Sequence, residues 1–246
     1  MEPIISVQGI KKSYGATAAV SGVSLEVRRG EIFGIVGPNG AGKTTIVECI
    51  ASLRTPDEGR IRVLGLDPVD EVRAVRERVG VQLQQSALPA RLRVVEALRL
   101  FASYYPDPAD IESLLIDWQL SDKRDAAVAS LSGGQRQRLF IALALVGTPE
   151  VVVLDELTTG LDPEVRRVTW QLVRKLRDQG ATVLLVTHFM DEVEQLCDRV
   201  AVIAAGRVVA SGTPAALMAQ ASQNGGSPRS FEDAYLTLTG ALANYA

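Results

Sequence analysis

Residues 37–45 read Gly-Pro-Asn-Gly-Ala-Gly-Lys-Thr-Thr and come directly after the apolar run Ile32–Val36. This pattern, G-x-x-x-x-G-K-[ST], joins a strand to a helix and turns its backbone N–H groups toward a phosphate. A helix beginning near Lys43 adds its positive end, and the Thr44 hydroxyl suits Mg²⁺. The alternative is a glycine-rich turn with no ligand. We predict a nucleotide site that includes Gly37, Pro38, Asn39, Gly40, Ala41, Gly42, Lys43, Thr44 and Thr45.

A second acidic strand narrows the class of nucleotide-binding protein. Residues 151–156 read Val-Val-Val-Leu-Asp-Glu, a buried strand that ends in two carboxylates. Asp155 suits the Mg²⁺ shell, and Glu156 is placed to polarise a water for in-line attack on a phosphate. Two solvated acids at a strand end are the alternative. A GTPase would need an Asn-Lys-x-Asp segment, and the sequence has none.

A second helix start carries an unusual glycine pair. Residues 131–138 read Leu-Ser-Gly-Gly-Gln-Arg-Gln-Arg. Ser132 and Gln135 have the spacing of a capping box. Gly133 and Gly134 each cost a helix about 1 kcal/mol relative to alanine, which makes sense if they leave the helix N-terminus bare for an anion. The sequence therefore contains one phosphate loop but two helix starts suited to phosphate.

These three motifs resemble those of the ATP-binding cassette family, the nucleotide-binding subunits of ABC transporters, over essentially the whole chain. The resemblance implies an ATPase that binds ATP and Mg²⁺. It also implies a head-to-tail dimer, either a homodimer or a pair of ATPase subunits, with two ATP molecules between the protomers. In that dimer Ser132, Gly133, Gly134 and Gln135 of one protomer would complete the site of the other.

The resemblance assigns further residues one at a time. Tyr14, expected after the first strand, matches the aromatic residue that stacks on adenine; otherwise it is an ordinary half-exposed aromatic side chain. Gln84 matches the Q-loop glutamine, which contacts Mg²⁺ and water and so has both a catalytic and a metal-binding role. Gln82 and Gln85 are close alternatives to Gln84.

Two residues after the acidic strand also match the family. Asp162, followed by Pro163, has the local pattern of a helix N-cap. The resemblance adds a D-loop role across the dimer. His188, the only histidine, matches the switch histidine that contacts the γ-phosphate, whereas a lone histidine is usually structural. Leu157 stands where the family usually has proline, and we expect measurable hydrolysis despite it.

The remaining sequence predicts a single α/β architecture. Central strands are expected at 32–36, 151–154, 182–186 and 200–204, and peripheral antiparallel strands at 4–10, 23–27 and 60–64. Helical periodicity replaces strands between about 85 and 148. We therefore predict a P-loop NTPase core with a mixed, mainly parallel sheet, an antiparallel β subdomain and an inserted helical subdomain. The ATPase domain would span 1–220, a linker 221–230 and a helical tail 231–246.

Composition limits the partners and the compartment. The 246 residues have a net charge of −3, so we expect no direct nucleic-acid binding. Cys49 and Cys197 form no C-x-x-C pair and fit a reducing compartment. The N-terminus shows no secretory pattern. The longest apolar run, 139–146, is roughly half of the ~20 residues that a membrane span needs, so we expect none.

By resemblance, the chain would sit on the cytoplasmic side of the membrane, docked on membrane-spanning permease subunits through the region 85–105. Residues 231–240 resemble the C-terminal end of bacterial drug- and antibiotic-exporter ATPases, and we expect no regulatory domain like that of sugar importers. This favours export of drugs, antibiotics or lipid-like compounds. The alternatives are a soluble cassette that acts on ribosomes or DNA, and a small-molecule P-loop kinase, which would leave residues 131–135 unexplained.

Overall fold

A six-stranded sheet forms the centre of the computed structural model, which describes residues 2–84, 87–223 and 226–240. The strand order is β5-β6-β7-β3-β8-β9, and every neighbouring pair is parallel except β8 and β9. The mixed, mainly parallel sheet is therefore confirmed. The strands are β3 (Ile32–Val36), β5 (Val79–Gln82), β6 (Val151–Asp155), β7 (Thr182–Thr187), β8 (Arg199–Ala204) and β9 (Arg207–Gly212).

Both faces of this sheet are buried, which explains the continuous apolar strands. Along β3, Ile32 and Val36 face one core cluster, whereas Phe33 and Ile35 face the other. The first cluster continues into α6 (Pro163–Asp178) and α7 (Met190–Leu196), and the second into α1 (Lys43–Ile50). Helices on one side and a helix with a second sheet on the other hold the strand ends rigidly.

The second sheet is antiparallel, as the sequence predicts, and its strand order is β2-β1-β4. Its strands are β1 (Ile5–Tyr14), β2 (Thr17–Val27) and β4 (Glu58–Val63). The expectation that Tyr14 follows the first strand is wrong, because Tyr14 pairs with Thr17 as the last residue of β1. The hairpin extends this far because Gly15, at φ 59°, makes a tight turn and register shifts accommodate the twist.

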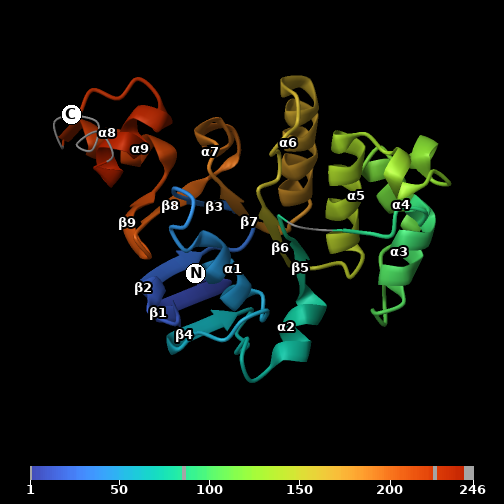
Figure 1. The fold of residues 1–246 in the computed structure, drawn as a ribbon, viewed down its shortest axis with the longest axis horizontal. Helices are drawn as coiled ribbons and strands as arrows, with labels where there is room; N and C mark the ends of the chain where they lie inside the picture. The colour runs from blue at the N-terminus through green and yellow to red at the C-terminus, as the bar shows by residue number, and fades with distance from the viewer. Residues whose placement is uncertain (1, 85–86, 224–225, 241–246) are drawn as a thin grey trace.

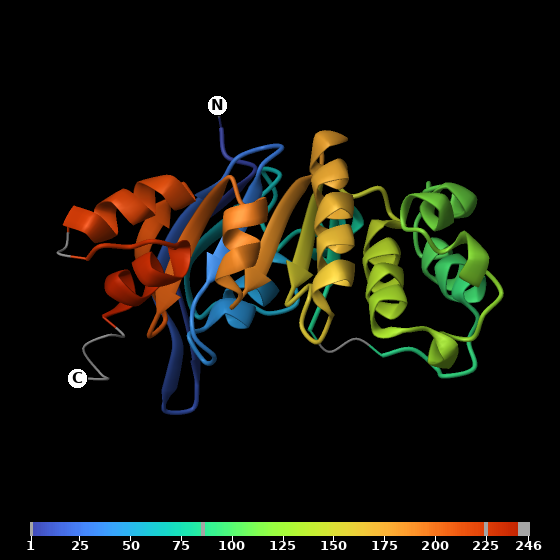
Figure 2. The same cartoon turned by 90° about the horizontal axis from the view of Figure 1, so that it is seen from above.

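A helical lobe projects from one end of the central sheet, as Figures 1 and 2 show. It contains α3 (Val94–Ala102), α4 (Ile111–Asp117), short 3-10 turns at Ser121–Lys123 and Val128–Ser130, and α5 (Gly133–Leu145). The helix α2 (Val72–Arg78) precedes β5 and was not predicted. The lobe lies where the sequence places the helical insertion, except that residues 85–86 fall outside the described part of the chain.

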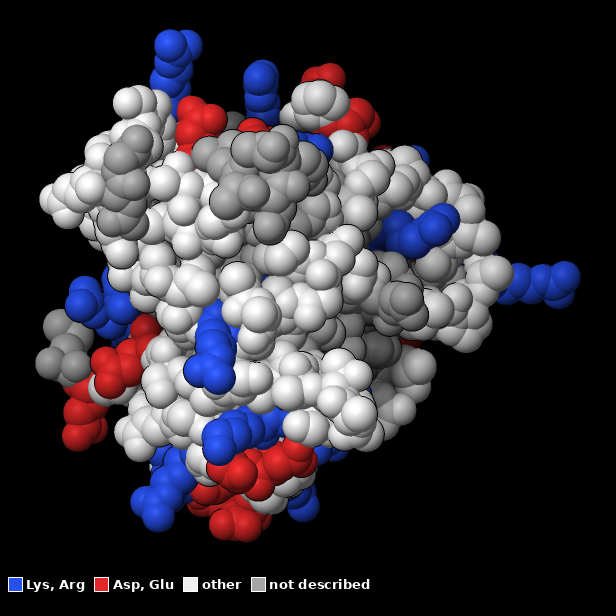
Figure 3. All heavy atoms as spheres, turned by 60° about the vertical axis from the view of Figure 1, so that its left-hand side comes forward, with Lys and Arg blue, Asp and Glu red and all other residues white. Residues whose placement is uncertain are grey.

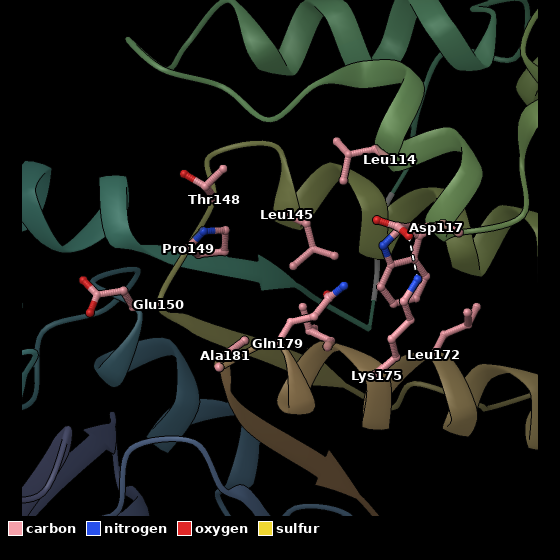
Figure 4. Close-up of a pocket in the computed structure, with 13 residues that line it drawn as sticks. Leu114, Asp117, Leu145, Thr148, Pro149, Glu150, Leu172, Lys175, Gln179 and Ala181 are labelled. Carbon is pink, nitrogen blue, oxygen red and sulfur yellow. Dashed lines mark hydrogen bonds and ion pairs between the residues drawn. The ribbon is translucent and has the colours of Figure 1, made fainter.

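A hollow of about 390 Å³ separates this lobe from the core, at the edge of the sheet where β6 and β7 begin. Leucines from α4, α5 and α6 line it. Figure 4 shows Lys175 of α6 and Asp117 of α4 pointing toward each other across it, and their Nζ and Oδ1 atoms lie 2.6 Å apart. The phosphate loop lies at the opposite edge, where β3 ends, so this hollow is not the nucleotide site.

At the other end of the molecule, α8 (Pro214–Gln223) and α9 (Phe231–Thr239) pack on the sheet. The range of α9 confirms the predicted last helix. The linker predicted from residue 221 begins too early, because residues 221–223 belong to α8; Ala221 is fully buried there. Residues 224–225 of the predicted linker and residues 241–246 of the predicted tail lie outside the described residues.

The face that includes this end is mainly uncharged in Figure 3. The helix α8, which lies at this end, contains no Asp, Glu, Lys or Arg. Within the described ranges, none of the helices combines the length and the apolar character needed to cross a membrane.

Candidate functional site

Glycines shape the phosphate loop between β3 and α1 because neighbouring backbone leaves no room for a side chain. A Cβ on Gly42 would lie 2.2 Å from the Ala19 carbonyl oxygen, and Gly42 has a φ of 97°. A Cβ on Gly37 would lie 2.2 Å from the Ile203 carbonyl oxygen. The loop therefore threads between β2 and β8, and its path is fixed by backbone on both sides.

Lys43 lies inside this loop. Its Nζ donates to the carbonyl oxygens of Gly37 and Pro38, at 2.8 and 3.0 Å. Burial lowers the pKa of Lys43, and the charges of Glu156 and Asp155 act in the opposite direction. The ammonium group is thus held at the mouth of α1 by the loop that would surround a phosphate.

Asp155 ends β6 beside the first turn of α1. Its Oδ2 lies 3.4 Å from Thr44 Oγ1, and the residue is only 1% exposed. Burial, together with the neighbouring charge of Glu156, raises the pKa of Asp155 to about 6. A buried carboxylate next to a hydroxyl is the oxygen donor set that Mg²⁺ prefers, so these residues fit the ion.

Glu156 adopts a strained backbone conformation at the strand end. Its φ is 51°, in the left-handed region that costs a residue other than glycine energy and is common at functional sites. Its Oε2 accepts from Gln84 Nε2 at 2.6 Å and from Thr159 Oγ1 at 3.3 Å. His188 Nδ1 lies 3.1 Å from Oε1. The structure therefore brings Glu156, Gln84 and His188 together from three elements.

The alternatives to Gln84 behave differently. Gln82 is 4% exposed, and its Nε2 donates to the carbonyl oxygen of Leu83 beside it. Gln85 lies outside the described residues. Between the two described candidates, Gln84 is the one that contacts Glu156. Leu157, which stands at the family's proline position, is fully buried in the core.

The candidate site is an open cleft of about 350 Å³. The phosphate loop lines one side of it, and Gln84 and Glu156 line the other. Tyr14 is not among its lining residues; the ring is 42% exposed, and the Arg54 guanidinium carbon lies 5.2 Å from its centre. The lining residues are Ala19, Asn39, Gly40, Gly42, Lys43, Thr44, Thr45, Gln84 and Glu156.

Residues 132–135 lie on the helical lobe and do not line this cleft. The predicted capping box is confirmed: Ser132 Oγ accepts from Gln135 N at 3.3 Å, and Gln135 Oε1 accepts from Ser132 N at 3.0 Å. The sequence does not indicate why residue 134 is a glycine. In the structure, a Cβ on Gly134 would lie 2.3 Å from Val165 Cγ1. Close packing of α5 on α6 therefore requires this glycine.

Asp162 caps α6, as predicted. Its Oδ1 accepts from Val165 N at 3.1 Å, and Pro163 occupies the first turn. Asp162 does not line the cleft of its own chain. Two residues were not predicted from the sequence: Thr159, which contacts Glu156, and Ala19, whose carbonyl limits the space at Gly42. The spacing of three residues from Glu156 to Thr159 was the only signal for the first, and the second needs the tertiary structure.

Comparisons with known proteins agree with this geometry. Residues 20–159 match the family described as ABC transporter. Nod factor export ATP-binding protein I of Ralstonia nicotianae is 44% identical over 217 residues, covering 86% of this chain and 68% of that protein. The protein of the same name from Paraburkholderia xenovorans is 44% identical over 223 residues, covering 89% of this chain and 73% of that protein.

Solved structures give the same result. An ATP-binding subunit of an ABC transporter has a TM-score of 0.84 at 28% identity, covering 96% of this chain and 99% of that chain. A dimeric ATP-binding cassette in a post-hydrolysis state, bound to ADP and Pi, has a TM-score of 0.76 at 26% identity, covering 85% and 98%. The fold, the site and these similarities lead to one conclusion: the chain belongs to the ABC transporter family.

Proposed function

We propose that this chain is the ATPase subunit of an exporter and that Glu156 directs the attacking water. The family hydrolyses ATP, and the similar curated proteins are named export ATP-binding proteins. One observation carries the assignment of Glu156: its carboxylate faces the same cleft as the phosphate loop and is held there by Gln84 and His188. A carboxylate fixed at this position can orient a water toward a terminal phosphate.

The other residues take roles that their positions support. Lys43 and the N–H groups of the loop would hold the phosphates of ATP. Thr44, Asp155 and Gln84 would hold Mg²⁺, which neutralises charge on the phosphates when bound. His188 would contact the γ-phosphate while its Nδ1 stays next to Glu156. Tyr14 would stack on adenine at the rim, a contact that tolerates different bases.

A second protomer would complete the site. Residues 132–135 and Asp162 do not line the cleft of their own chain, although Ser132, Gly133 and Asp162 are exposed at their helix starts. In a head-to-tail dimer they would meet the ATP held by the partner. The solved cassette dimer bound to ADP and Pi supports this arrangement.

Glu156→Gln tests the role of Glu156. This change keeps shape and hydrogen bonding but removes the base, so we expect kcat to fall by roughly 10²–10⁴-fold with ATP binding retained. Light scattering with saturating ATP and Mg²⁺ should show a dimer. Glu77→Gln, an exposed change in α2, is the matched control. Wild-type hydrolysis by Glu156→Gln would exclude the assignment, and a monomer under these conditions would exclude the composite site.

A hollow of about 360 Å³ between β5 and the helical lobe is the proposed docking place for a membrane-spanning permease. Leu53, Phe101 and Phe140 line it together with Arg76, and Leu53 is 42% exposed. It adjoins Gln82, two residues before Gln84, so a helix seated there would sense the nucleotide site. This supports a peripheral location on the cytoplasmic side of the membrane.

Co-purification tests the exporter assignment. A tagged chain should recover a multi-spanning membrane protein from gently solubilised membranes, and Leu53→Glu should reduce that recovery. Ile116→Glu is the matched control, because Ile116 is 68% exposed on α4 and does not line the hollow. Recovery with ribosomes or nucleic acid instead would favour the soluble alternative. Phosphate transfer to a small acceptor would favour a kinase.

A further inference from the structure

A buried carboxylate lies behind the proposed catalytic residues and has no role in the mechanism above. Glu192, in the first turn of α7, is fully buried. Its Oε1 accepts a hydrogen bond from Thr158 Oγ1 and another, of 3.3 Å, from Trp170 Nε1. Thr158 is also fully buried, and Trp170 is 8% exposed.

The second oxygen of this carboxylate is unsatisfied. Glu192 Oε2 is buried, and no described residue offers it a hydrogen bond. Burying a carboxylate with one unpaired oxygen opposes folding, and an apolar side chain of similar shape is often equally good or better for stability. Stability alone therefore does not explain a glutamate at this position.

The positions of the three partners suggest another reason. Thr158 follows Glu156 by two residues, and Glu192 follows His188 by four. The Thr158–Glu192 bond thus ties together the same two segments that meet at the Glu156–His188 contact of 3.1 Å. Trp170 adds α6, whose N-cap is Asp162. One carboxylate oxygen joins the loop after β6, the helix after Asp162 and the helix after His188.

We propose that Glu192 is a positioning residue for ATP hydrolysis, which it serves by fixing the loop of Glu156 against the segment of His188. The Thr158–Glu192 hydrogen bond stabilises the loop that begins at Glu156, whose backbone has a strained φ. Without it, Thr158 would be free to move, and with it the direction of the Glu156 carboxylate. This inference rests on the proposed role of Glu156.

The double variant Thr158→Val/Glu192→Met tests the proposal, because it removes both ends of the Thr158–Glu192 bond and leaves apolar groups of similar size. The indole N–H of Trp170 loses its acceptor in this variant, and this loss opposes the gain from removing a buried carboxylate with an unpaired oxygen, so we expect a Tm close to that of the parent. We expect kcat to fall ten- to a hundred-fold, the order of effect of a misplaced catalytic group, with KM for ATP within threefold. Thr158→Val alone, which leaves the Trp170–Glu192 bond in place, should lose a similar factor, since the same bridge is broken. Thr158→Ser, which keeps the hydroxyl, should retain the kcat of the parent.

Thr169→Val is the matched control, because Thr169 is also a fully buried threonine but its Oγ1 donates only to the Val165 carbonyl within α6. Its kcat should stay within twofold of the parent. A double variant with kcat within threefold of the parent would refute the bridge, as would a loss that follows a lowered Tm. Glu156→Gln in parallel separates the two ideas. If it abolishes hydrolysis while the double variant does not, only the role of Glu192 fails; if it hydrolyses normally, the role of Glu156 fails first.

Discussion

The two helix starts that suit phosphate, those of α1 and α5, differ in how their first N–H groups are capped. At α1, the N-cap is Gly42, and no side chain of the described residues caps the N–H groups. At α5, Ser132 and Gln135 close a reciprocal capping box. The first four N–H groups of any helix lack partners inside the helix. No described side chain therefore competes with a ligand at the start of α1, whereas at α5 the capping box already engages the N–H groups of Ser132 and Gln135.

The surroundings of the two starts differ as well. The loop before α1 lies between backbone groups of β2 and β8, at the edge of a sheet that is buried on both faces. The start of α5 lies on the helical lobe, where Ser132 and Gly133 are exposed. One half of the site is thus preorganised for phosphate. The other half of the proposed composite site, the start of α5, would have to exchange an internal bond, the 3.3 Å contact between Gln135 N and Ser132 Oγ, for a phosphate oxygen of the partner's ATP.

Breaking the preorganised half should have the largest effect. Gly42→Ala would place a Cβ 2.2 Å from the Ala19 carbonyl at a φ of 97°, so the loop must move. We expect ATP binding, measured by calorimetry, to weaken at least 100-fold, the order of a misplaced binding group. Gly30→Ala is the control, because its φ of 72° imposes similar strain with no atom within 4 Å. Equal effects of the two changes would show that strain alone, not the close approach, matters.

The second half should respond to the packing of α5 on α6. Gly134→Ala would bring a Cβ to within 2.3 Å of Val165 Cγ1 and push the start of α5 away from the core. We expect kcat to fall about tenfold, since a shift of roughly 1 Å is enough for such losses. Val165→Ala on the same chain should restore most of it. A loss that Val165→Ala does not relieve would assign Gly134 to phosphate contact instead of helix packing.

Much of the site follows from the sequence because its residues are close together in the chain. The phosphate loop, the Asp155-Glu156 pair, the capping box and the Asp162 cap each need fewer than ten consecutive residues to recognise. The failures involve longer distances. The Cβ limit at Gly134 depends on Val165 in another helix, and the bond of Thr158 to Glu192 spans 34 positions.

The fold shows the same division. The strands β3, β6, β7 and β8 are predictable because both of their faces are buried, which leaves a continuous apolar run in each, whereas β5 and β9 of the same sheet were not predicted. In contrast, residues 221–223 look like the start of a linker because the small uncharged residues Ala, Ser and Gln carry little amphipathic pattern. That they belong to α8 becomes evident only when Ala221 is seen to be buried. Burial that depends on a distant element leaves little local trace.

Removing the charge of Asp155, which lies beside the phosphate loop, should stabilise the folded protein at high pH. The pKa of about 6 lies above the ordinary 3.8, so the ionised form is disfavoured in the folded state. The loss of folding stability caused by ionised Asp155 is therefore fully present above pH 6 and disappears as the pH falls from about 6 through 3.8. For Asp155→Asn without nucleotide or Mg²⁺, we expect a gain on the order of 2 kcal/mol at pH 8 and a smaller one at pH 5. Thermal melts at both pH values measure it; destabilisation at pH 8 would show that the Thr44 contact outweighs burial.

The smallest effect should come from the ion pair that joins the helical lobe to the core. Lys175 and Asp117 are 52% and 42% exposed, so solvent screens their attraction despite the 2.6 Å distance. For Lys175→Met we expect a stability loss of about 0.5 kcal/mol or less and hydrolysis within twofold of the parent. Arg73→Met, which breaks an exposed pair inside α2, is the control. A change of tenfold or more in kcat, seen for Lys175→Met but not for Arg73→Met, would mean that this pair sets the position of the lobe. In that case the start of α5 would be held in place by one surface contact, in contrast to the backbone that encloses the phosphate loop.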